Sequence, residues 1–165
     1  MFEHIDKAGS FSGPMRRNLV SMLDEVGVAE RLGVSSTDRL FETGQGGASF
    51  TSCISAPVFR NGKNYTGTRI LQIPRIRDWV IRHLTEELGS AHDAIVVPLG
   101  KVANAVVTHL ESAGLVQLGE RFLRRFPHPS GANGHRLEHF KQGRDGWRRQ
   151  ILGSVRCNDR AAARD

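Results

Sequence analysis

A continuous apolar run, Ala94-Ile95-Val96-Val97-Pro98-Leu99, constrains the fold of this chain more than any other segment. An uninterrupted run of this length, with no polar alternation, is expected of a parallel strand that is buried on both faces. Gly100 follows directly, and residues 101–113 have the pattern of a helix. A strand, a glycine turn and a helix in that order form a βα unit, so the run predicts an α/β fold.

Other segments extend this prediction to a small parallel sheet combined with helices. Apolar residues recur at helical spacing from Arg16 to Glu25, after a Pro14 that suits a first helical turn. Pro74 begins another amphipathic segment, and Gly89 is expected to end it. The expected helices are 14–25, 28–33, 74–88, 101–113 and 137–151, and the expected strands are 48–54, 94–99 and 121–126, with a polar loop at 56–69.

The length and composition exclude several classes of protein. A chain of 165 residues with 39% hydrophobic residues can bury the core of one domain. No apolar run approaches the ~18–20 residues that cross a bilayer, and residues 1–6 lack the basic and apolar regions of a signal peptide. Cys53 and Cys157 are too few for a disulfide scaffold. We therefore expect a cytoplasmic protein.

The excess positive charge is concentrated near the C-terminus. Residues 1–118 carry 12 basic and 12 acidic side chains, whereas residues 119–165 carry 11 basic and 5 acidic ones, which accounts for the whole net charge of +6. A basic segment on a neutral body favours an anionic partner such as nucleic acid. The alternative is a solvated C-terminal segment with no partner.

The densest cluster of turn-forming residues lies at 127–136 and contains a candidate functional histidine. Pro127 and Pro129 bracket His128 and restrict the backbone on both sides of it. A stiff loop after a strand can hold an imidazole in one orientation, and ligands bind at this edge of α/β sheets. The alternative is an exposed loop histidine without a role.

This loop and three further motifs resemble the uracil-DNA glycosylase superfamily. Pro127-His128-Pro129-Ser130 is similar to its His-Pro-Ser motif, and Gly9-Ser10-Phe11-Ser12-Gly13 to its Phe-containing turn before a helix. Phe50-Thr51-Ser52-Cys53 resembles its strand ending in Thr-Asn, and Val97–Ala103 its Leu-Gly-Lys-x-Ala turn. The four motifs occur in the family's order, from about residue 8 to residue 152.

The resemblance implies a three-layer α/β/α domain over residues 1–152, with residues 153–165 as a basic, flexible tail. It implies hydrolysis of the N-glycosidic bond of a uracil-type base that is flipped out of DNA for repair. The reaction needs no cofactor. The expected partner is DNA, with no membrane and no metal, and the chain is expected to be a monomer.

Individual roles also follow from the resemblance. His128 is the expected catalytic residue, because it matches the histidine that donates a hydrogen bond to the base as negative charge develops there. Phe11 would stack on the base and Ser52 would bind its edge. The expected DNA contacts are Pro129, Ser130, Gly131, Asn133, Arg136 and Arg125.

Two features depart from the family. Ser52 stands where the family often has Asn, and a hydroxyl discriminates a base edge less well than an amide does. The family's first motif is a central strand and a loop that positions the attacking water, and only Glu3 and Asp6 offer carboxylates before Gly9. We therefore expect a domain that is incomplete at its N-terminus, and a poor or inactive glycosylase.

Other interpretations remain. The chain could be a nucleic-acid-binding module without catalysis on the same scaffold, or an α/β protein that binds a small molecule. A thiol site at Cys53 with His128 has no support in the spacing. His135 and His139, at i and i+4, have no third metal ligand nearby in the sequence.

Overall fold

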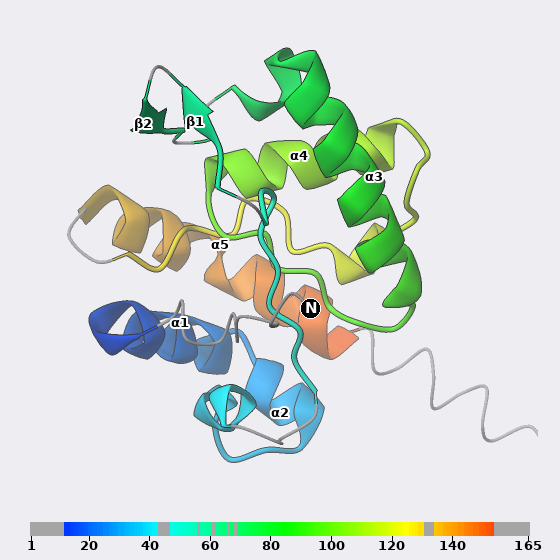
Figure 1. Ribbon diagram of the computed structural model, residues 1–165. Helices are drawn as coiled ribbons and strands as arrows, with labels where there is room; N and C mark the ends of the chain where they lie inside the picture. The colour runs from blue at the N-terminus through cyan, green and yellow to red at the C-terminus, as the bar shows by residue number, and fades with distance from the viewer. Residues whose placement is uncertain are drawn as a thin grey trace, which may run out of the picture. The chain divides into compact units, whose positions relative to one another are not determined.

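The computed structural model of the chain describes residues 12–42, 47–55, 57–60, 62–65, 67, 69–130 and 134–153. Contacts divide the chain into two compact units. Unit 1 contains the described residues up to Phe50 and those from Pro127 onward, and unit 2 contains Thr51–Phe126. Helices dominate both units (Figure 1).

Unit 1 contains helices α1 (Gly13–Glu25), α2 (Val28–Leu32) and α5 (Gly134–Gly153), with a short 3-10 helix, η2 (Thr37–Phe41). Pro14 lies in the first turn of α1, where its missing N–H costs nothing. Gly27, at φ +88°, separates α1 from α2 in a left-handed conformation that side chains rarely adopt. The helices expected at 14–25 and 28–33 are therefore confirmed, and α5 is longer than the predicted 137–151.

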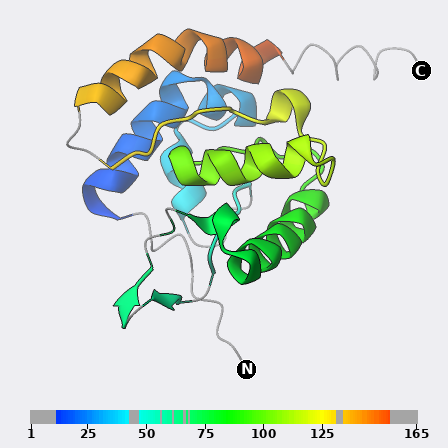
Figure 2. The ribbon, with the colours of Figure 1, turned by 90° about the horizontal axis from the view of Figure 1, so that it is seen from above.

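The core of unit 1 lies where α5 runs beside α1 and α2 (Figure 2). Phe140, Trp147 and Ile151 recur on one face of α5 and are buried. The rings of Phe140 and Trp147 are stacked, with their centroids 5.9 Å apart. The first half of the unit contributes the buried residues Leu19, Leu23, Val26, Val28, Ala29 and Phe41.

Unit 2 contains helices α3 (Pro74–Ser90) and α4 (Lys101–Ser112), the short 3-10 helices η3 (Ile70–Gln72) and η4 (Gly119–Arg121), and strands β1 (Phe59–Arg60) and β2 (Lys63–Asn64). Helix α3 continues past Gly89, the residue expected to end it, and α4 agrees with its predicted range to one residue. One apolar cluster joins α3, α4, η3 and the segment 116–122. Its buried members are Ile70, Val80, Leu84, Val106, Val107, Leu110, Val116, Leu118 and Phe122.

The expected three-layer α/β/α fold with a parallel sheet is wrong. Among the described residues, the strands are β1 and β2, which form a two-residue antiparallel pair. The expected strands 94–99 and 121–126 share a single parallel bridge between Val96 and Phe122. There the Val96 N–H donates to the Arg121 carbonyl (2.8 Å), and the Leu123 N–H donates to the Val96 carbonyl (3.0 Å).

The apolar run 94–99 is only partly buried: Pro98 is buried, residues 95–97 and Leu99 are half-buried, and Ala94 is exposed, so the expected burial on both faces is also wrong. Pro98 has no N–H and interrupts the donors of 94–99. The segment 48–54 forms no strand and bends at Cys53, although it is rich in β-favouring residues. Phe50 packs on the Phe41 ring at 4.9 Å, and Ile54 packs on the core of unit 2. High β-propensity reflects side chains that pack well on a half-buried surface. A segment with this propensity can therefore pack without pairing with another strand.

Candidate functional site

The candidate histidine lies in an extended segment, 127–130, whose two prolines are buried. His128 is half-buried, and the backbone N–H of Ser130 donates a hydrogen bond to its Nδ1 (3.1 Å). The Ser130 hydroxyl lies 3.0 Å from the same nitrogen. A backbone N–H can only donate, so Nδ1 must accept and cannot carry the proton. In the neutral imidazole the proton is therefore on Nε2, which becomes the donor of the ring.

Helix α1 holds this loop from a distance in sequence. The Asn18 side-chain amide donates to the carbonyl of Pro129 (3.0 Å), in a partly buried contact that joins residues 111 positions apart. The bond fixes the backbone directly after His128, so Asn18 positions the imidazole. Sequence reasoning missed Asn18, because an asparagine inside a helix carries no local signal for a contact this remote.

Arg125 lies in unit 2, at a strained turn. Its φ of +59° is left-handed, a conformation that costs a non-glycine residue about 1–2 kcal/mol. Its N–H donates to Oδ1 of Asn104 in α4 (2.6 Å), which holds the turn in place. The Arg125 side chain is exposed and forms no ion pair within the part of the chain described by the structure. Its expected role as a phosphate contact therefore stays a prediction.

The two arginines that precede Arg125 are occupied within unit 2. Arg121 donates to the carbonyls of Ala91 (2.8 Å), Ala94 (3.1 Å) and Gln117 (3.0 Å). Arg124 pairs with Glu111, and its guanidinium covers the Phe122 ring at 4.5 Å. These cations stabilise the chain itself, so they add less to an anion-binding surface than their number in the sequence suggests.

Ser52 is exposed, in the extended segment that begins unit 2. Its neighbour Thr51 donates to Glu87 of α3, and Nε2 of His83 lies 3.5 Å from the same carboxylate oxygen. On the other side, Cys53 packs against the core of unit 2, and burial raises the pKa of its thiol. The neighbours thus hold Ser52 in place while its own hydroxyl stays accessible.

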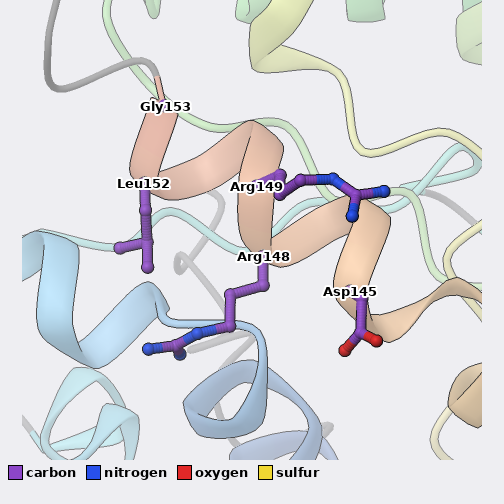
Figure 3. A pocket seen from close by; sticks show the side chains of 5 residues that line it. All are labelled: Asp145, Arg148, Arg149, Leu152 and Gly153. Carbon is purple, nitrogen blue, oxygen red and sulfur yellow. The ribbon is translucent and has the colours of Figure 1, made fainter.

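Some basic side chains on α5 form ion pairs and hydrogen bonds within unit 1. Arg148 pairs with Glu30 of α2 (2.6 Å) and donates to the Glu25 carbonyl (3.4 Å). Arg144 lies 3.8 Å from the Glu25 carboxylate. Figure 3 shows Arg148 extending from α5 toward α1 and α2 while Arg149 points away. Arg144 and Arg148 are therefore engaged in contacts between helices.

The hollow beside this part of α5 has a mixed charge. It is lined by Asp145, Arg148, Arg149, Leu152 and Gly153 (Figure 3). One of its two arginines is paired with Glu30, and Asp145 adds a negative charge. The hollow therefore does not form a concentrated anion site.

Phe11, Gly131 and Asn133 lie outside the described residues, as does the side chain of Arg136. His128, Pro129 and Ser130 belong to unit 1, whereas Ser52 and Arg125 belong to unit 2. The structure thus brings together His128, Pro129 and Ser130, which the sequence predicts as one loop, and adds Asn18 to them.

In the part of the chain that the structure describes, no three His, Cys, Asp or Glu side chains are grouped as a metal site would require. His139, one of the two histidines at i and i+4, packs near the Trp147 ring, with the centroids 6.2 Å apart. No described helix is both long and apolar enough to span a membrane.

The chain is similar to an uncharacterized protein, YoxB, of Bacillus subtilis (strain 168). The two are 40% identical over 148 residues, which cover 87% of this chain and 57% of the relative. The chain thus spans little more than half the length of that relative. No protein-family model and no solved structure matches the chain.

Proposed function

We propose that His128 is the base-binding histidine of a uracil-DNA glycosylase-like protein and donates from Nε2 to a carbonyl oxygen of a base taken out of DNA. The observation that carries this proposal is the hydrogen bond from the Ser130 N–H to Nδ1 of His128. It makes Nε2 the donor of the neutral ring, which is the role implied by the resemblance of the Pro127–Ser130 motif. The order of the four motifs along the chain supports the same function.

The chemistry follows from where charge develops. When the glycosidic bond breaks, its electron pair passes to the base, and the base carbonyl oxygens take part of the negative charge. A donor that is already oriented stabilises that charge without reorganisation, and removing one such donor costs about 10²–10³ in rate. Two prolines, the Ser130 N–H and the Asn18 amide all restrict the His128 loop, which is the preorganisation this mechanism needs.

The roles expected of Ser52 and Arg125, which lie in unit 2, are proposed separately from that of His128. Ser52 is exposed and could offer its hydroxyl to the edge of a base. Arg125 has a cationic side chain available for phosphate. The chain spans just over half of its relative, so the reaction of the whole protein is a proposal. The experiment therefore measures DNA binding separately from release of the free base.

The test compares two single-stranded DNA molecules that differ at one position, where one carries uracil and the other an abasic analogue. Their affinities are measured by fluorescence anisotropy, and free base is quantified in the same samples. The wild-type chain is expected to prefer the uracil strand. His128→Ala should reduce this preference about 2- to 12-fold, which corresponds to one net hydrogen bond of about 0.5–1.5 kcal/mol.

Two further variants sharpen the comparison. His92→Ala removes an exposed histidine of unit 2 and should keep the wild-type preference. Asn18→Ala should give an intermediate preference, because the loop is loosened while the imidazole stays. Any base release by the wild-type chain should fall about 10²–10³-fold in His128→Ala. Equal preferences in His128→Ala and the wild-type chain would refute the proposed role.

A further inference from the structure

Strands β1 and β2 form a small ribbon at the margin of unit 2 (Figures 1 and 2). The paired residues are Phe59 with Asn64 and Arg60 with Lys63, so the connecting turn has two residues. Gly62 in this turn has a φ of +72°, as two-residue hairpin turns require. At the base of the ribbon the Tyr65 N–H donates to the Val58 carbonyl (2.7 Å), and Tyr65 packs on the core.

The ribbon is basic, with no acidic residue near it in the sequence. Residues 43–77 contain five basic side chains and no acidic one. Arg60 and Lys63 are direct cross-strand partners, an arrangement in which like charges destabilise the pair. Lys63 is exposed and forms no ion pair with any residue that the structure describes. An anion bound beside Lys63 would supply the partner that this cation lacks among the described residues.

The same ribbon carries an exposed aromatic ring. Phe59 is 66% exposed, more than any other large hydrophobic residue among those described. Successive positions of a strand alternate between its faces, so position 59 lies on one face of the ribbon, and the paired positions 60 and 63 lie on the other. A strand of nucleic acid that crosses the tip can therefore meet the ring on one side and the basic pair on the other.

We propose that the β1–β2 ribbon binds single-stranded nucleic acid, with a base stacked on Phe59 and backbone phosphates beside the Arg60–Lys63 pair. An apolar protein surface would cover Phe59 but would leave the like-charged pair on the other face without a partner. A duplex offers phosphates, but its bases are already stacked and present no face to Phe59. Single strands bind proteins through this combination of aromatic platforms and cations. The proposal is independent of the role of His128.

The test uses the full chain and a fluorescein-labelled 15-residue oligothymidylate, with anisotropy measured at several salt concentrations. Phe59→Ala should weaken binding about 5- to 100-fold, the effect of losing one base–aromatic stack, and leave the salt dependence unchanged. Phe59→Trp should bind like the wild-type chain, and Phe59→Leu should resemble Phe59→Ala. Lys63→Ala should reduce the slope of log K against log salt by about 0.7, the value for one phosphate contact of a single strand.

Matched controls lie elsewhere in unit 2. Leu115→Ala removes another exposed apolar side chain, and Arg82→Ala removes a cation of α3. Both should bind oligothymidylate like the wild-type chain, and the wild-type chain should bind the single strand more tightly than a matched duplex. The proposal fails if Phe59→Leu binds like the wild-type chain, or if the duplex binds equally well. The Phe59 and Lys63 variants leave the His128 loop unchanged, so their effects are distinguishable from that of His128→Ala.

Discussion

Two glycines of α5 should respond in opposite ways to the same substitution. A Cβ atom on Gly143 would lie 2.5 Å from Cη2 of Trp147, whereas a Cβ atom on Gly146 would meet nothing within 4 Å. Ordinary contacts between carbon atoms lie at about 3.5–4.0 Å, so the Trp147 ring would have to move about 1 Å. That ring is buried and stacked on Phe140, so it has little room to move.

The magnitudes follow from two contributions to the free energy of unfolding. Replacing glycine by alanine inside a helix gains about 0.8–1.0 kcal/mol. Forcing an extra methyl group into a packed core costs about 1–3 kcal/mol. Gly146→Ala should therefore stabilise unit 1 by about 1 kcal/mol. The free energy of unfolding of Gly143→Ala should be about 1–3 kcal/mol lower than that of Gly146→Ala, because both variants share the gain in helix propensity and only Gly143→Ala crowds the core.

Urea unfolding followed by Trp147 fluorescence measures this difference. The chain has two tryptophans, so a Trp79→Phe background makes the signal report unit 1 alone. With a denaturant slope of about 1–3 kcal/mol per molar urea, the two midpoints should differ by about 1 M. In a Trp147→Phe background followed by circular dichroism, Gly143→Ala should become stabilising. If both glycine variants raise the midpoint equally, the close packing of Trp147 on Gly143 is wrong.

Two further predictions concern backbone strain and thiol chemistry. Gly27→Ala should destabilise the chain more than Gly33→Ala in urea unfolding. Both residues have positive φ values (+88° and +65°), but a Cβ atom on Gly27 would also meet side chains of α5 at 3.1–3.3 Å, whereas one on Gly33 would meet nothing within 4 Å. In a Cys157→Ser background, Cys53 should react with iodoacetamide more slowly than a free model thiol at pH 8, because burial raises its pKa and keeps the thiolate scarce. The rate should keep rising beyond pH 9, and a plateau below pH 9 would contradict the raised pKa.

Helices could be predicted because their signals are local. Pro14 acts through its own backbone preference and lies in the first turn of α1, as predicted, and Gly27 and Gly33 flank α2 in the left-handed conformation that glycine favours. Gly89 is the exception, since α3 continues past it to Ser90. A glycine costs a helix only about 1 kcal/mol, which the packing of α3 can offset.

The sheet could not be predicted, because pairing depends on segments far apart in the chain. The runs 94–99 and 121–126 do approach one another, but they form one bridge, between Val96 and Phe122. Their apolar residues favour burial but do not specify a pairing partner, and in the structure 94–99 is mostly half-buried, whereas Phe122, Leu123 and Phe126 are buried without a ladder. The opposite error concerns 56–69, where the composition predicts a polar loop. There Asn61-Gly62, a strong hairpin signal, marks the turn between β1 and β2.

The same distinction between local and long-range contacts applies to the candidate site. The restricted loop around His128 could be predicted from Pro127 and Pro129, and its hydrogen bond to Ser130 spans two residues. The contact from Asn18 could not, because it depends on how α1 packs. Summing the charges over long stretches of sequence also hid a local feature. Residues 1–118 are neutral in sum, which concealed the acid-free segment 43–77.

The division of the chain into units has a consequence for synthesis. Unit 2 is one continuous segment, so all the elements that pack in its core have left the ribosome once Phe126 has emerged. Unit 1 is interrupted, because α1 and α2 must wait for α5, which follows unit 2 in the chain. Until then the apolar faces around Leu19 and Leu23 have no helix to cover them, and exposed surfaces of this kind promote aggregation. We therefore expect newly made unit 1 to aggregate more readily than newly made unit 2.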